Sequence, residues 1–427
     1  MNFRSEKSEM QSHIKKTPDF ILSVMALVLS SIFFFYTPRI GDKLRLQDFT
    51  AILNLLVVFM FTYKRMFRLP KVFFFELVSV IYITTITIIF CLVRNNLDAL
   101  LLVLRDLFYF SNFALIYSIK LHFPKVQLNA QVSVFVGLTC LFASYIGFTD
   151  ILLSERGYYG IGYFTEKYNS AGSSVAFFLI GVLSIACYLD KNRIFFLIGG
   201  CASFLLCCFT GSRTGMLMVV IFAFTFVFLI FNFRTRILII CIFIFPFLLL
   251  LSNRTELAAF LWNYEYDNEI LRSVVRRFST ILTLETVIGH SRFESWSRLL
   301  ERFDIIALWG NGRGSTHLVN GQFSLGLGSD SGYLKTLIEY GIIGSVFYYG
   351  VFMAVCFKVY RLIDKKAQML LLSFISAVSF AELSYEYLQT AFGGYGTWLS
   401  LGLVLLICSP KIIGEENKNV SYSSSCP

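Results

Sequence analysis

The stretch from Thr214 to Phe231 reads TGMLMVVIFAFTFVFLIF and contains no charged residue and no proline. A helix that crosses a bilayer needs about 20 consecutive apolar residues, because the hydrocarbon core is about 30 Å thick and a helix rises 1.5 Å per residue. The stretch therefore predicts a transmembrane helix. Similar apolar runs recur along the whole chain, so the pattern of this stretch indicates the fold class of the protein.

The composition of the chain agrees with this interpretation. Of 427 residues, 56% are hydrophobic and 15% are charged, whereas soluble domains carry about 25% charged residues. This composition argues against a water-soluble enzyme and excludes a disordered chain. We predict an all-α, polytopic membrane protein with about 12 transmembrane helices. The predicted spans are residues 19–37, 48–63, 72–93, 98–119, 128–149, 170–189, 194–210, 214–231, 237–252, 332–357, 367–382 and 395–409.

The positions of Lys and Arg predict the orientation of these spans. An even number of spans places both termini on one side, and the tails and loops of that side are rich in basic residues such as Lys15, Lys64, Lys120 and Lys365. Basic loops face the cytoplasm, so both termini are expected there. The net charge of +10 then reflects topology and contact with anionic lipid, and no nucleic-acid partner is expected. The predicted parts are spans one to nine (1–252), a long periplasmic loop (253–331), spans ten to twelve (332–410) and a cytoplasmic tail (411–427).

The long loop has an unusual charge pattern. It contains eight arginines and no lysine, namely Arg254, Arg272, Arg276, Arg277, Arg292, Arg298, Arg302 and Arg313. Arginine presents a planar fork that matches phosphate and carboxylate, whereas lysine is a point charge. The loop also holds nine carboxylates, so a solvated domain with internal salt bridges is the alternative.

Two amphipathic helices are predicted within the loop, over 271–282 and 291–307. The second begins with a capping box, Ser291 followed by Glu294. The segment from Gly310 to Gly314 then ends the helical pattern. Such a glycine-rich loop suits either a close approach of backbone to a ligand or a simple turn.

Polar residues also lie within or at the edge of the predicted spans. Arg105 and Asp106 fall inside the fourth span, and because adjacent residues do not share a helix face, each needs a partner of its own. Arg105 either pairs with a carboxylate of another helix or lines a substrate groove. Arg213 lies in the short turn from Gly211 to Gly215, at the expected level of the lipid head groups, where it suits a lipid or substrate phosphate. No CxxC pattern or metal-ligand spacing is present.

The strongest local pattern is GSDSGYLKTLIEYGIIG from Gly328 to Gly344, which runs from the loop into the tenth span. Asp330 is expected at the N-terminus of that helix. It is either an ordinary helix cap or a carboxylate at the outer membrane edge that acts as a general base.

These features together resemble the Wzy-type polysaccharide polymerases, which share a superfamily with the O-antigen ligases. The resemblance rests on the topology with one long loop before the last three spans, and on several motifs: Ser212–Gly215, Tyr168–Ser170, Arg292-x-x-x-Trp296 with Gly310-x-Gly312, and Asp330–Leu334 running into Glu339–Gly344. The O-antigen ligases usually have a His-rich signature near the start of the span after the long loop. Asp330 occupies that neighbourhood, which favours a polymerase.

The resemblance implies a metal-independent glycosyltransferase in the bacterial inner membrane, with no cofactor. Its donor would be a growing O-antigen or related glycan on undecaprenyl diphosphate, and its acceptor a lipid-linked repeat unit. A regulator of chain length is an expected partner. Asp330 is the candidate base, and the leaving diphosphate would be bound by Arg213, Arg292 and Arg298, with Arg276 and Arg277 in reserve. Weaker candidates for substrate binding are Arg105, Tyr158, Tyr159, Asn169, Trp296 and Ser331.

Two alternatives remain open. A ligase would transfer finished glycan to the lipid A core. A flippase or transporter for lipid-linked sugar would also have about a dozen spans, although transporters tend to show paired repeats and discontinuous helices, and no matching repeat relates the two halves of this sequence.

Overall fold

The computed structural model describes residues 21–22, 25–30, 39–40, 44–63, 71–94, 98–122, 170–209, 212–232, 234–237, 252–263, 275, 279, 308–313, 315, 331–384, 387–388 and 391–409. Most of this part of the chain is helical, and the rest consists of short loops such as 308–313 and a two-residue antiparallel ladder between β1 (Arg39–Ile40) and β2 (Leu44–Arg45). The helices are α3 (Leu46–Tyr63), α4 (Lys71–Arg94), α5 (Asp98–His122), α7 (Ser170–Lys191), α8 (Ile194–Phe209), α9 (Arg213–Ile230), α11 (Arg254–Asn263), α14 (Gly332–Leu362), α15 (Lys365–Ser384) and α16 (Ala391–Cys408).

Five of these helices are long and apolar enough to cross a membrane, namely α4, α7, α9, α14 and α15. Shorter apolar stretches lie in α3, α8 and α16. Many of their large apolar side chains face outward, for example Phe75 at 61%, Leu92 at 77% and Val346 at 68% exposure. A soluble protein rarely exposes so many apolar side chains, and lipid is the solvent that suits them. The chain is therefore a helical membrane protein.

The predicted spans agree with the described helices wherever the two overlap. The helices α3, α4, α5, α7, α8, α9, α14, α15 and α16 each coincide with one predicted run. Residues 128–149 lie outside the described part, as do most of 19–37 and 237–252. The total of twelve spans and the periplasmic position of 253–331 therefore stay predictions. The amphipathic helices predicted over 271–282 and 291–307 also lie outside it, apart from Val275 and Ser279, which are helical.

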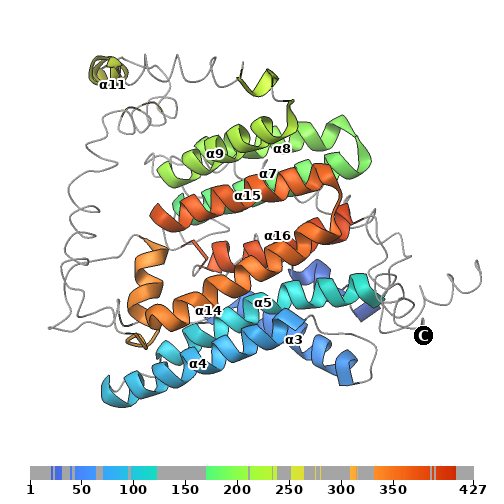
Figure 1. The fold of residues 1–427 in the computed structure, drawn as a ribbon, viewed down its shortest axis with the longest axis vertical. Coiled ribbons are helices and arrows are strands. Elements are labelled where there is room, and N and C mark those ends of the chain that lie inside the picture. Colours follow the sequence, from blue (N-terminus) through green and yellow to red (C-terminus); the bar gives the residue numbers. More distant parts are fainter. Residues whose placement is uncertain are drawn as a thin grey trace, which may run out of the picture.

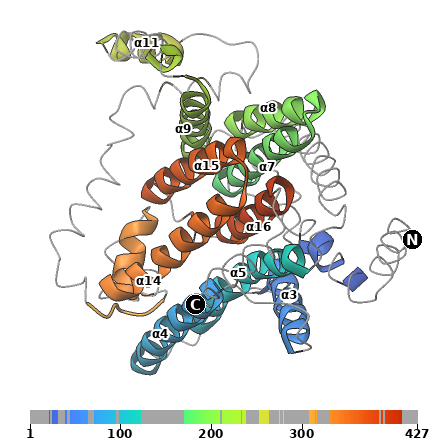
Figure 2. The same cartoon turned by 45° about the vertical axis from the view of Figure 1, so that its right-hand side comes forward.

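The helices form two groups joined by α14 and α16 (Figures 1 and 2). In one group α5 packs against α3 and α4, and in the other α7 packs against α8, while α15 packs against α9. The helix α16 contacts both α5 and α7, and α14 contacts both α4 and α15. Aromatic rings fill the contact between α16 and α5, where Trp398 of α16 meets Phe110 of α5 with 5.1 Å between ring centroids.

The run predicted at 332–357 is longer in the structure and is broken near its start. Gly341 of α14 has φ 70° and ψ −175°, values that no helical residue adopts. The break divides α14 into a short arm, 332–340, and a long arm, 342–362, which point in clearly different directions (Figure 1). The long arm alone extends for about 30 Å, enough to cross the hydrocarbon core.

Candidate functional site

The break in α14 is occupied by the loop from Leu308 to Arg313. In an unbroken helix the Glu339 carbonyl would accept a hydrogen bond from the amide of Ile343. Here the amide of Gly312 donates to the Glu339 carbonyl at 2.8 Å, and the amide of Ile343 donates instead to the Leu308 carbonyl at 3.3 Å. The Asn311 amide also donates to the Ile338 carbonyl at 3.0 Å. The loop thus satisfies backbone groups that the break leaves open, which a membrane protein requires of non-helical backbone.

Two glycines let this loop approach α14 so closely. Gly310 has φ 83° and Gly312 has φ 87°, in the left-handed region that residues with a side chain rarely adopt. A Cβ atom on Gly310 would lie 2.5 Å from the Gly341 backbone nitrogen, and one on Gly312 would lie 2.7 Å from the Phe90 side chain. The loop therefore packs closely against the backbone of α14 at Gly310 and against Phe90 of α4 at Gly312. The approach to a ligand that the glycine-rich sequence suggested stays a prediction.

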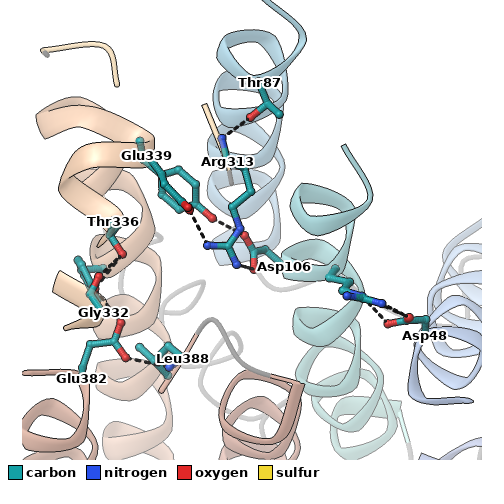
Figure 3. Close-up of polar contacts among 12 residues, drawn as sticks. Asp48, Thr87, Asp106, Arg313, Gly332, Thr336, Glu339, Glu382 and Leu388 are labelled. Carbon is teal, nitrogen blue, oxygen red and sulfur yellow. Dashed lines mark hydrogen bonds and ion pairs between the residues drawn. The ribbon is translucent and has the colours of Figure 1, made fainter. Parts of the chain in front are cut away.

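The loop ends in a buried ionic cluster made of Arg313, Asp106, Glu339 and Tyr340. Figure 3 shows the first three of these residues. Nη1 of Arg313 donates to Oε2 of Glu339 at 2.9 Å, and Nη2 lies 3.9 Å from Oδ1 of Asp106. The Tyr340 hydroxyl donates to Oδ2 of Asp106 at 2.7 Å. The Arg313 amide donates to the Thr87 hydroxyl at 3.0 Å. One arginine thereby ties together α4, α5 and the short arm of α14.

The charge state of Arg313 follows from these contacts. Burial lowers the pKa of the guanidinium, but the neighbouring Tyr340, Asp106 and Glu339 outweigh it and raise that pKa well above its ordinary value. The side chain stays charged although it is only 3% exposed. Among the alternatives for the loop arginines, the internal salt bridge is the one that the structure shows for Arg313.

A second polar group lies at the start of α14 and centres on Glu382 of α15, which is 1% exposed. Its Oε2 accepts from the Leu388 amide at 2.8 Å, and its Oε1 accepts from the Tyr349 hydroxyl at 2.9 Å. The carboxylate lies directly against Gly332, where a Cβ atom would collide with it. The Tyr333 hydroxyl donates to the Ser379 carbonyl at 3.2 Å. These contacts fasten the short arm of α14 to α15.

The structure describes three of the predicted site residues. Arg213 is the first residue of α9 and is half-buried, next to Ser212, whose hydroxyl accepts from the Gly215 amide at 3.2 Å and caps that helix. Ser331 is buried at the N-terminus of α14, and its side chain makes no capping hydrogen bond. Arg105 forms a bidentate ion pair with Asp48 of α3, with Nη2 2.9 Å from Oδ2.

The other predicted site residues lie outside the described part of the chain, so their roles stay predictions. They are Asp330, Arg276, Arg277, Arg292, Arg298, Trp296, Tyr158, Tyr159 and Asn169. A substrate role for Arg105 and Arg213 also stays a prediction. For Arg105, the ion pair with a carboxylate of another helix is one of the two alternatives that the sequence offered.

Sequence reasoning missed most of the ionic cluster. It indicated that Asp106, one charge inside the fourth span, needs a partner of its own, but it could not identify Arg313. Glu339 and Tyr340 were part of a motif without a stated role. The signal that was available is the placement of Glu339 and Asp106 inside apolar runs, because a buried carboxylate requires a cation or hydrogen-bond donors. Within the described residues, no three His, Cys, Asp or Glu side chains gather in a way that would hold a metal ion.

No protein-family model matches the chain, and no curated protein matches it.

Proposed function

We propose that the chain is a membrane glycosyltransferase that polymerises oligosaccharide repeat units carried on undecaprenyl diphosphate, in the bacterial inner membrane. The observation that carries the proposal is the ordered set of motifs that resembles the Wzy-type polymerases. Two of these motifs, Gly310-x-Gly312 and Glu339–Gly344, are in direct contact, since the loop bonds the broken backbone of α14. Motifs that are distant in sequence and interlock in space support a common function. In this proposal both termini are cytoplasmic and residues 253–331 lie outside.

The reaction needs no nucleotide sugar, because the lipid diphosphate supplies a good leaving group. The acceptor hydroxyl oxygen attacks the anomeric carbon of the donor glycan, and the bond between that carbon and the phosphate oxygen breaks. Undecaprenyl diphosphate departs with the electron pair, and the hydroxyl proton passes to the carboxylate of Asp330 as general base. Preorganised arginines stabilise the negative charge that develops on the leaving diphosphate. The proposed arginines are Arg213, Arg292 and Arg298, with Arg276 and Arg277 as further candidates.

The described contacts refine the proposal in two ways. Arg313 is committed to Asp106 and Glu339, so the proposed diphosphate site does not include it. The short arm of α14 is held by Tyr333 and by the contact of Gly332 with Glu382. Asp330 is joined to this arm through the buried Ser331. A firmly held helix start supports a role for the adjoining chain in positioning a reacting group, because catalytic groups need rigid support.

The direct test is Asp330→Ala in purified protein supplied with lipid-linked repeat unit. Chains longer than one repeat should disappear while the yield and melting temperature of the protein stay unchanged. The control is Asp190→Ala, because Asp190 is an exposed residue of α7 and its replacement should leave chain growth intact. Long chains made by Asp330→Ala would exclude this residue as the base.

One observation favours the transporter alternative, namely the discontinuous helix α14. Transporters build substrate sites from such broken helices. The break in α14 is filled by the chain's own loop, which argues for a structural break. Reconstitution separates the two functions, since growth of glycan chains in vesicles without a membrane gradient is not an activity of a flippase. A ligase is distinguished by its acceptor, because it would transfer glycan to the lipid A core and would not extend lipid-linked repeat units.

A further inference from the structure

Both arms of α14 contact the same side chain of α15. The carboxylate of Glu382 lies directly against the backbone of Gly332 at the start of the short arm. Its Oε1 also accepts a hydrogen bond at 2.9 Å from the hydroxyl of Tyr349 on the long arm. Its Oε2 accepts at 2.8 Å from the amide of Leu388, in the connection between α15 and α16. Figure 3 shows the Glu382 carboxylate beside Gly332 and bonded to Leu388. One carboxylate therefore fastens three segments of the chain to one another.

A chain of hydroxyl groups joins the two arms a second time. Oγ1 of Thr336, on the short arm, lies 3.1 Å from the hydroxyl oxygen of Tyr349, on the long arm. The Tyr349 hydroxyl donates onward to Glu382. Beside this chain the rings of Tyr333 and Tyr349 pack with 5.1 Å between their centroids. Thr336 and Glu382 are both buried, so the link lies inside the protein. The short arm is thus held here as well as at the ionic cluster.

Apolar packing would fasten these segments at a lower cost than a carboxylate does. A buried acidic side chain loses its hydration, and well-packed apolar residues of similar volume are often at least as stabilising as buried charged ones. Glu382 lies at the N-terminal end of α14, where the helix dipole favours a negative charge and offsets part of this cost. Carboxylates inside membrane spans commonly have a function. This one contacts the helix start that directly follows the candidate base Asp330 in the sequence.

We propose that Glu382 is a positioning residue for the reaction, because it sets the angle of the short arm and thereby the place of Asp330. The inference rests on the proposed glycosyltransferase function. Ser331 is buried and is joined to Asp330 by one peptide bond, so a shift of the short arm is passed on to the candidate base. A displacement of about 1 Å lowers a reaction rate about 100-fold. Glu382 acts on turnover and not on substrate binding, since the proposed diphosphate contacts are made by arginines.

Steady-state kinetics of the purified full chain with lipid-linked repeat unit test the assignment. Glu382→Ala should lower kcat about 100-fold and leave KM unchanged, as expected for support that is needed only in the transition state. Glu382→Gln should retain most of the turnover. Its carbonyl oxygen accepts from the Leu388 amide, and its NH2 group donates to the Tyr349 oxygen while the Tyr349 hydroxyl turns to Thr336. Equal losses of kcat in the two variants would overturn the proposal.

The matched control is Gly402→Ala, in the part of α16 that packs against α5. A Cβ atom on Gly402 would lie 2.7 Å from the Ile116 side chain, so this variant should melt below the wild type without disturbing the short arm. Its kcat per folded molecule should equal that of the wild type. A loss of turnover as large as that of Glu382→Ala would show that lowered stability alone reduces activity, and the proposal would be wrong.

Hydrogen exchange measured by mass spectrometry reports on the short arm without any glycan synthesis. Glu382→Ala should speed the exchange of the amides in residues 335–340 and leave residues 346–359 as protected as in the wild type. Gly402→Ala should change neither segment. If Glu382→Ala does not fold, Tyr349→Phe provides the same comparison, because it removes the hydroxyl that joins Thr336 to Glu382. It should also speed exchange in residues 335–340 and lower kcat at constant KM.

The outcomes separate a failure of this inference from a failure of the proposed function. Wild-type protein that forms no glycan chains overturns both. Wild-type protein that forms chains, together with an undiminished kcat in Glu382→Ala or Tyr349→Phe, overturns the inference alone. A raised KM at constant kcat would make Glu382 a substrate-binding residue and would also overturn it. The same holds for a lowered kcat with unchanged exchange in residues 335–340.

Discussion

Replacing Arg313 with methionine should destabilise the protein strongly. Methionine fills much of the space of the arginine stem but leaves Asp106 and Glu339 as buried carboxylates without their shared cation. Removing one partner of a buried ion pair costs about 3–5 kcal/mol. The Tyr340 hydroxyl still donates to Asp106, and the Arg313 amide still reaches Thr87. The lower half of that range, about 3–4 kcal/mol, is therefore the expected loss.

The assay is thermal or denaturant unfolding of purified protein in detergent, followed by tryptophan fluorescence. A double variant, Arg313→Met with Glu339→Gln, makes the test more specific. The second substitution removes the carboxylate that lies 2.9 Å from the guanidinium. The double variant should therefore be more stable than Arg313→Met alone by more than about 1 kcal/mol, because the two residues are coupled. The matched control is Arg213→Met, because Arg213 is half-buried at a helix start and its loss should cost about 1 kcal/mol or less.

The reasoning would be refuted if Arg313→Met unfolded like the wild type and lost only its activity. Arg313 would then be a substrate-binding residue, and the ion pairs in the cluster would contribute nothing to the fold. A failure of the double variant to recover any stability would show that Glu339 is not the residue left uncompensated.

Two glycine substitutions test how the loop and the short arm of α14 are held, with Gly350→Ala as their common control. A Cβ atom on Gly350 meets nothing within 4 Å, so this change should be neutral or stabilise the helix by about 0.5–1 kcal/mol. Gly310→Ala should destabilise by about 2–4 kcal/mol, because it combines a left-handed φ with a clash against backbone atoms; a melting temperature equal to that of the control would show that the loop does not need the close approach. Gly332→Ala should displace the Glu382 carboxylate from its two donors and lower the free energy of unfolding by about 1–3 kcal/mol in the same melting assay. Glu382→Gln keeps the shape of the side chain and should cost less. If Glu382→Gln destabilises the protein more than Gly332→Ala does, the close contact between Gly332 and Glu382 is not what holds the short arm.

The membrane helices were predictable because lipid imposes its constraint on each segment separately. A span must be apolar over a fixed length wherever it lies in the fold, so the local sequence carries the signal. The run predicted at 214–231 corresponds to α9 at Arg213–Ile230, and the run predicted at 170–189 corresponds to α7 at Ser170–Lys191. The same argument explains why the ends of the helices are reproduced to within a few residues.

The polar contacts between helices were much less predictable. A charge inside a span announces that it needs a partner, and this was clear for Arg105 and Asp106. The identity of the partner depends on which helices pack together and in which register. Asp48 lies on α3 and Arg313 lies in a loop far along the chain, and no periodicity within α5 points to either. The break at Gly341 could not be predicted for a similar reason. Apolar residues continue on both sides of it, and a hydropathy pattern carries no information on the backbone angle φ.

The structure explains in part why residues 253–331 contain arginine and no lysine. Arg313 contacts carboxylates on two different helices, because its Nη1 lies 2.9 Å from Glu339 and its Nη2 lies 3.9 Å from Asp106. A lysine ammonium is a single compact charge and does not span two such partners with a planar fork. The packing of α14 against α5 therefore favours arginine at this position independently of any ligand. A preference for arginine over lysine in this loop is consequently insufficient to assign a phosphate site. Each remaining arginine has to be assigned by whether its loss lowers stability, as predicted for Arg313, or lowers glycan synthesis at unchanged stability, as proposed for Arg292 and Arg298.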